Sequence, residues 1–83
     1  MEPEWTTTDR QDLYANAFRV GHNIAEVLID CGRAYADTDT RFLLRLITTP
    51  SDAKQLLALL SAALQDYEAR FGPIPDREGG ANR

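Results

Sequence analysis

The segment GHNIAEVLIDCG, residues 21–32, decides the fold, because it places His22, Glu26 and Asp30 four residues apart in an otherwise apolar run. In a helix these three polar side chains would stack on one face and could form a metal or acid–base site. In a strand they would follow one another at intervals of about 13 Å, too far apart to share one ion. The choice between helix and strand therefore decides whether this segment can hold a site.

Residues 13–35 fit both interpretations. As two strands, YANAFRV and AEVLIDCG are β-suited runs separated by Gly21-His22-Asn23, which would form a tight turn with an exposed His22 ring. As a helix, the segment has one continuous apolar stripe of Leu13, Ala17, Val20, Ile24, Val27, Cys31 and Tyr35. The pattern alone leaves both interpretations open.

The segment TTPSDAKQLLALLSAALQDYEARFGP, residues 48–73, predicts a helix of about six turns. Thr49 is a suitable N-cap, Pro50 suits the first helical position, and Asp52 lies at the third. Gly72 and Pro73 predict the C-terminal end. Leu59 lies off the main stripe and suggests a second contact surface. The main stripe contains Ala53, Leu56, Leu57, Leu60, Ala63, Leu64, Tyr67 and Phe71.

Two runs, YANAFRVGHNIAEVLIDCG and TTPSDAKQLLALLSAALQDYEARFGPIP, resemble the small prokaryotic domain-of-unknown-function family numbered thirty-four sixty-seven. The likeness covers about residues 14–75. Val27 and Cys31 depart from the family pattern, which tends to have aromatic residues there. The resemblance implies antiparallel strands followed by one long helix, and it implies no activity. The matching residues are Tyr14, Asn16, Glu26, Ile29, Asp30, Gly32, Thr49, Pro50, Ala53, Lys54, Leu56, Leu57, Tyr67, Glu68, Phe71 and Gly72.

A third apolar run, RFLLRLIT at residues 41–48, is too short for a separate helix and predicts a strand that is apolar on both faces. The prediction is an α+β fold, in which a three-stranded antiparallel sheet is followed by one long C-terminal helix (β-β-β-α) over residues 12–75. A disordered acidic tail, residues 1–11, and a flexible tail, residues 76–83, would flank this single domain.

One helix covers one face of such a sheet, so a homodimer or higher oligomer is expected to cover the other. The predicted oligomer interface contains Leu28, Leu43, Ile47 and Leu59.

A charge-matched register is predicted for the second and third strands, with paired residue numbers summing to 71. Asp30 would then face Arg41, and Glu26 would face Arg45, as structural ion pairs that fix the register. On this face Leu28 would oppose Leu43. On the other face, which would pack against the helix, the predicted pairs are Ile29 with Phe42, Val27 with Leu44 and Ala25 with Leu46.

The composition excludes several function classes. Thirteen acidic residues against nine lysines and arginines give a net charge of −4, which repels phosphate and anionic membranes. One cysteine, Cys31, and one histidine, His22, give neither a metal-ligand spacing nor a nucleophile motif, so we expect no catalytic residue, metal or cofactor. No apolar run is long enough to span a bilayer, and the N-terminal sequence is acidic, so a soluble cytoplasmic protein is expected.

The leading hypothesis is a non-enzymatic, self-associating adaptor or accessory protein that acts through protein–protein interaction. The alternative is a β-ribbon nucleic-acid-binding regulator, based on Arg19, Arg33, Arg41 and Arg45. Tyr14 and Asn16 could line a ligand groove, or they could be a packed ring and an amide tied to the neighbouring strand or turn.

Overall fold

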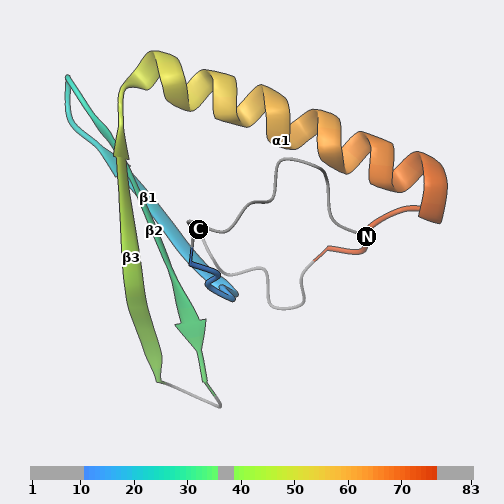
Figure 1. Ribbon diagram of the computed structural model, residues 1–83, viewed down its shortest axis with the longest axis horizontal. Coiled ribbons are helices and arrows are strands. Elements are labelled where there is room, and N and C mark those ends of the chain that lie inside the picture. Colours follow the sequence, from blue (N-terminus) through green and yellow to red (C-terminus); the bar gives the residue numbers. More distant parts are fainter. Residues whose placement is uncertain (1–10, 36–38, 77–83) are drawn as a thin grey trace.

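The computed structural model describes residues 11–35 and 39–76. It contains the strands β1 (Ala17–His22), β2 (Val27–Ala34) and β3 (Thr40–Thr48), followed by the helix α1 (Pro50–Phe71) (Figure 1). The strands form one antiparallel sheet in the order β1-β2-β3. The predicted β-β-β-α order and the strand interpretation of residues 21–32 are confirmed. The predicted tails lie almost wholly outside the described residues.

The turn between β1 and β2 is built by Asn23, two residues later than predicted. The Asn23 Oδ1 atom accepts hydrogen bonds from the backbone N–H groups of Ala25 and Glu26, each at 2.8 Å. The Asn23 N–H donates to the Glu26 carbonyl at 3.0 Å. This side-chain-to-backbone turn lets β1 continue through His22, which pairs with Val27. His22 is therefore an exposed strand residue, and Glu26 belongs to the turn.

The predicted register of β2 and β3 is wrong by four residues. Asp30 opposes Arg45 rather than Arg41, and Leu28 opposes Ile47 rather than Leu43. More than one register of β2 and β3 places an arginine opposite an acidic residue. In the register that the structure adopts, Asp30 also has Arg19 of β1 opposite it. Because the shift is an even number of residues, the β3 side chains from Leu44 to Ile47 lie on the sheet face predicted for them.

A β-bulge interrupts the pairing of β2 with β3 between Cys31 and Gly32. Cys31 opposes Leu44 while Gly32 opposes Phe42, so Leu43 is the extra residue. Gly32 is buried, and a Cβ atom there would collide with the Arg41 carbonyl oxygen and would lie 2.7 Å from the Phe42 Cα. The bulge needs glycine because the β3 backbone occupies the space of a side chain.

The bulge also moves Phe42 to the sheet face that carries Asp30. The Arg19 guanidinium lies 4.0 Å from the centre of the Phe42 ring, on that face. The predicted pairing of Phe42 with Ile29 is therefore wrong. The predicted partners Val27 with Leu44 and Ala25 with Leu46 are also replaced, because Val27 opposes Thr48, and Leu46 opposes Ile29.

The predicted helix boundaries are confirmed. The Thr49 Oγ1 accepts a hydrogen bond from the Asp52 N–H at 3.0 Å, and Pro50 occupies the first helical position. At the other end Gly72 adopts a φ of 96°, which favours glycine, and its N–H donates to the Glu68 carbonyl. Local capping signals thus set both ends of α1.

The prediction that α1 packs over the sheet of its own chain is wrong. The helix leaves the end of β3 and runs away from the sheet (Figure 1), and no α1 residue is buried. Within the described part of the chain the buried residues are Ala17, Asp30 and Gly32, all in the sheet. Within the described residues, a single chain therefore has no core between helix and sheet.

We expect Gly32→Ala to lower the free energy of unfolding by about 1–3 kcal/mol, because the added methyl group forces the β3 backbone away from β2. Gly21→Ala is the matched control, because a Cβ atom at Gly21 meets nothing within 4 Å. That control should change the stability by less than about 0.5 kcal/mol. Urea denaturation followed by circular dichroism at one protein concentration measures both, and equal effects would contradict the role of Gly32.

Candidate functional site

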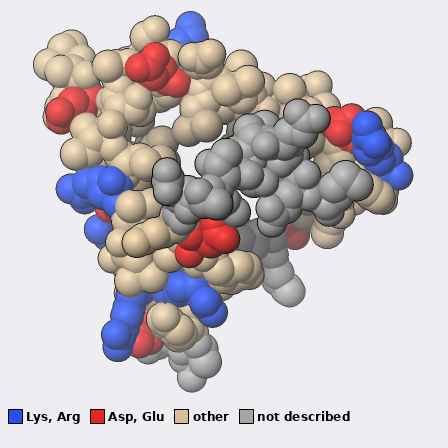
Figure 2. All heavy atoms as spheres, in the orientation of Figure 1, with Lys and Arg blue, Asp and Glu red and all other residues tan. Residues whose placement is uncertain are grey.

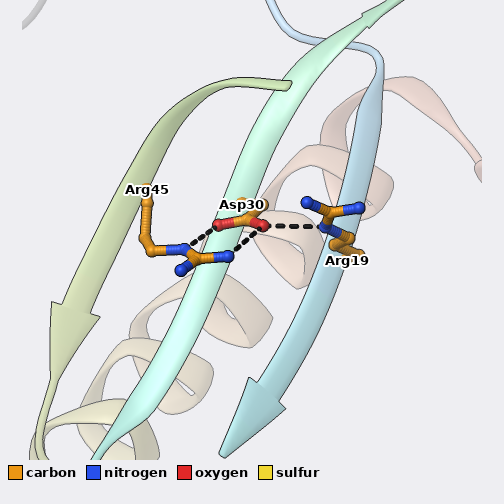
Figure 3. A network of polar contacts seen from close by, with 3 residues as sticks. All are labelled: Arg19, Asp30 and Arg45. Carbon is orange, nitrogen blue, oxygen red and sulfur yellow. Dashed lines mark hydrogen bonds and ion pairs between the residues drawn. The ribbon is translucent and has the colours of Figure 1, made fainter. Parts of the chain in front are cut away.

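Among residues 11–35 and 39–76, the most buried polar residue is Asp30 in β2, which two arginines hold from the neighbouring strands (Figure 3). Arg45 of β3 donates from Nε to Asp30 Oδ1 at 2.7 Å and from Nη2 to Oδ2 at 3.0 Å. Arg19 of β1 donates from Nε to Oδ2 at 2.7 Å. Asp30 is 4% exposed, whereas both arginine side chains are more than half exposed. We call Arg19, Asp30 and Arg45 the arginine clamp.

The arginine clamp keeps Asp30 ionised. Hydrogen bonds from Arg45 and then from Arg19 hold the pKa of Asp30 far below its ordinary value, although its desolvation acts in the opposite direction. The Asp30 carboxylate in turn raises the pKa of Arg45. A carboxylate whose pKa lies far below neutral pH is a weak general base. The geometry of the clamp suits tying three strands together.

The structure does not bring His22, Glu26 and Asp30 together. His22 lies at the end of β1, and Glu26 lies in the turn, where its carboxylate accepts from Asn23 Nδ2 at 3.2 Å. Over residues 11–35 and 39–76, no group of three or more His, Cys, Asp or Glu residues could hold a metal ion.

Of the four predicted ion-pair residues, Asp30 and Arg45 form an ion pair with each other. The predicted pairs of Glu26 with Arg45 and of Asp30 with Arg41 are wrong, because the register differs. The Arg41 Nε atom instead lies 3.5 Å from the Asp39 Oδ2 atom. Sequence reasoning missed Arg19 as the third member of the clamp, because the β1–β2 pairing was not assigned.

Asn16 extends the sheet just before β1 begins. Its Oδ1 accepts from the Ala34 N–H at 2.7 Å, its Nδ2 donates to the Ala34 carbonyl at 3.5 Å, and its N–H donates to the Gly32 carbonyl at 2.9 Å. These bonds match the structural alternative for Asn16, an amide tied to the neighbouring strand.

Tyr14 belongs to a second cluster that the sequence did not predict. The Arg33 guanidinium lies 4.8 Å from the centre of the Tyr14 ring and 5.5 Å from that of Tyr35. Both distances are in the range of cation–π contacts. The cluster occupies the end of the sheet where β2 finishes, and Tyr14 in it is 68% exposed. A role for Tyr14 in a ligand groove stays a prediction.

Two apolar surfaces are open to solvent, one on each layer. Cross-strand partners on the side opposite the clamp form the apolar sheet face, and α1 carries the predicted stripe, which we call the apolar helix stripe. Val20 on the sheet is 69% exposed and Leu57 on the helix is 64% exposed. Figure 2 shows blue lysine and arginine atoms gathered over the sheet. The apolar sheet face contains Phe18, Val20, Ile29, Cys31, Leu44 and Leu46.

The four predicted interface residues do not form one patch. Leu28 and Ile47 oppose each other on the clamp side of the sheet, Leu43 lies at the bulge, and Leu59 lies in α1. Leu43, Ile47 and Leu59 are exposed, and Leu28 is half-buried. Their role in an interface stays a prediction.

The residues that build this sheet and start this helix, such as Asn16, Asp30 and Thr49, are those that carry the family resemblance. The family described as "Protein of unknown function (DUF3467)" matches residues 1–76. The chain belongs to the DUF3467 family. No curated protein and no solved structure matches this DUF3467 chain at a significant level. No helix in its described part is long and apolar enough to cross a membrane.

We expect Asp30→Asn to lower the melting temperature of this DUF3467 protein at pH 7 and to flatten its dependence on acid. Because folding lowers the pKa of Asp30, the stabilisation is complete above the ordinary pKa of 3.8 and is lost as the pH falls below it. The wild-type melting temperature should therefore drop between pH 5 and pH 3 by more than that of the variant.

Asp66→Asn is the control for this prediction, because Asp66 forms an exposed pair with Arg70 at 3.1 Å. Such a pair contributes little to stability. Thermal denaturation followed by circular dichroism at both pH values gives the comparison. Parallel curves for wild type and Asp30→Asn would show that the clamp does not set the acid dependence.

Proposed function

We propose that this protein is a non-enzymatic, self-associating adaptor that acts through protein–protein contacts in the cytoplasm. The observation that carries the proposal is the amount of apolar surface exposed on both layers. Monomeric soluble proteins rarely expose contiguous apolar patches larger than a few hundred Å². The large exposed apolar residues are Phe18, Val20, Leu43, Leu44, Leu46 and Ile47 in the strands and Leu56, Leu57, Leu59, Leu60, Leu64, Tyr67 and Phe71 in the helix.

The lack of a buried core supports self-association. Among the described residues Ala17 is the one buried apolar side chain, at 8% exposed, and no α1 residue is buried. Each partner in a standard protein–protein interface buries roughly 800 Å². An assembly that covers both apolar surfaces would supply the missing core.

The chemistry of the most buried polar group supports the non-enzymatic part of the proposal. Enzyme acids and bases have pKa values near the working pH, whereas the clamp moves the pKa of Asp30 away from it. Asn16 uses its amide in the sheet, and Arg33 stacks against two tyrosine rings. Each of these groups makes contacts within the fold, which supports the non-enzymatic proposal.

The alternative, a β-ribbon nucleic-acid-binding regulator, has weaker support. Arg19 and Arg45 already bind Asp30, Arg33 stacks on tyrosines, and Arg41 lies beside Asp39. The net charge of −4 also opposes binding to phosphate. A salt-sensitive shift of generic duplex DNA would favour this alternative, and the absence of binding at low salt would remove it.

We expect analytical ultracentrifugation to find a dimer or larger oligomer at micromolar concentration. Leu60→Glu, at the centre of the apolar helix stripe, should raise the dissociation constant by at least about tenfold, because burial of a leucine contributes about 1.5–3 kcal/mol. Gln65→Glu, on the polar side of the same helix, should leave it nearly unchanged. A folded wild-type monomer of 9.3 kDa would contradict the proposal.

A further inference from the structure

We propose that two copies of this chain exchange helices, so that α1 of each protomer covers the apolar sheet face of the other. This inference rests on the proposed self-association and specifies its geometry. The occupant of each apolar surface is then a second copy of the same chain. Three features of the structure lead to it: the connection before α1, the match between the two apolar surfaces, and the direction in which α1 leaves the sheet.

The connection between β3 and α1 is a single residue. β3 ends at Thr48, α1 begins at Pro50, and Thr49 lies between them in an extended conformation with φ −85° and ψ 158°. Pro50 favours this extended conformation, and the Thr49 side chain caps the helix. Connections that return a helix onto its own sheet usually contain about 2–6 residues. The chain therefore holds its own helix away from its own sheet.

The two exposed surfaces complement each other in size and chemistry. A helix of 22 residues is about 33 Å long, and a strand of nine residues spans about 30 Å. The apolar helix stripe includes Leu57, which is 64% exposed, and Phe71, which is 72% exposed. The apolar sheet face includes Val20, which is 69% exposed. One chain thus carries an apolar helix stripe and an apolar sheet face that could pack against each other, but within the chain both are exposed.

The direction of α1 suits a symmetric exchange. In Figure 3 the arginine clamp lies on the near face of the sheet and α1 lies behind the sheet, on the side of the apolar sheet face. A two-fold related copy can place its own helix on that side while it receives the first helix in return. Such reciprocal exchange closes the assembly as a dimer. A different protein on these surfaces would leave this self-complementarity unused.

The test lengthens the connection by about six Gly and Ser residues between Thr48 and Thr49. The longer connection lets α1 fold back onto its own sheet, where its effective concentration is in the millimolar range. We expect a helical monomer at micromolar concentration and a dimer dissociation constant at least about 100-fold above that of wild type. The same insertion between Pro75 and Asp76 is the control and should leave the dimer intact. Ultracentrifugation and circular dichroism measure both.

The outcomes separate the exchange from the proposed function. If the Thr48–Thr49 insertion keeps the wild-type dissociation constant, self-association stands and the exchange is overturned. If wild type is monomeric, or dimerises only with another protein, both are overturned.

A second experiment decides the question if the insertion variant fails to fold. Leu60→Glu damages the apolar helix stripe, and Leu46→Glu damages the apolar sheet face. With exchanged helices, a mixed dimer of these two variants contains one layer in which neither surface is altered. Co-expression should therefore yield a folded heterodimer at a protein concentration at which neither variant alone forms a dimer. Without exchange no intact layer exists in the mixture, so a failure to recover the dimer would overturn the inference.

Discussion

The binding of the Asp30 carboxylate by Arg19 and Arg45 fixes the arrangement of all three strands. The two arginines come from opposite neighbours of β2, so only the order β1-β2-β3 places one on each side of the acid. A shift of β2 by one residue would move Asp30 to the apolar face, where its charge would have no partner. The clamp thus ties the register of β2 to both of its neighbours, because the one buried acid has a partner on each of them.

The backbone next to the clamp follows from the same register. Asp30 and Gly32 point to the same face, and the bulge opposite Gly32 brings the β3 backbone so close that no side chain fits. Asn16, directly before β1, forms hydrogen bonds with Gly32 and Ala34 and so extends the pairing of the two strands by one residue. The segment from Ile29 to Gly32 therefore has two separate requirements, a charge that selects the register and a residue without a side chain.

The parts of the fold that depend on local chemistry could be predicted from the sequence. Thr49, Pro50 and Gly72 act within one helical turn of themselves, so both ends of α1 followed from the sequence. The register of β2 and β3 did not follow from the sequence, because one of the two arginines that bind Asp30 is Arg19, which belongs to a third strand. The bulge at Leu43 was also hidden, since it depends on where the β3 backbone lies. For the candidate site, the sequence identified Asp30 and Arg45 as ion-pair residues but assigned each to the wrong partner.

The position of α1 shows a different limit of sequence reasoning. A stripe such as Leu57, Leu60 and Leu64 states that one face of a helix must be buried, but it does not state in which chain the covering surface lies. The one-residue connection at Thr49 restricts where the helix can go, and the proposed exchange follows from this restriction. When the covering surface belongs to a second copy, folding and association become one equilibrium, and the stability of each protomer depends on protomer concentration. Under the proposed helix exchange, this chain would fold fully only where enough copies are present to complete the layer.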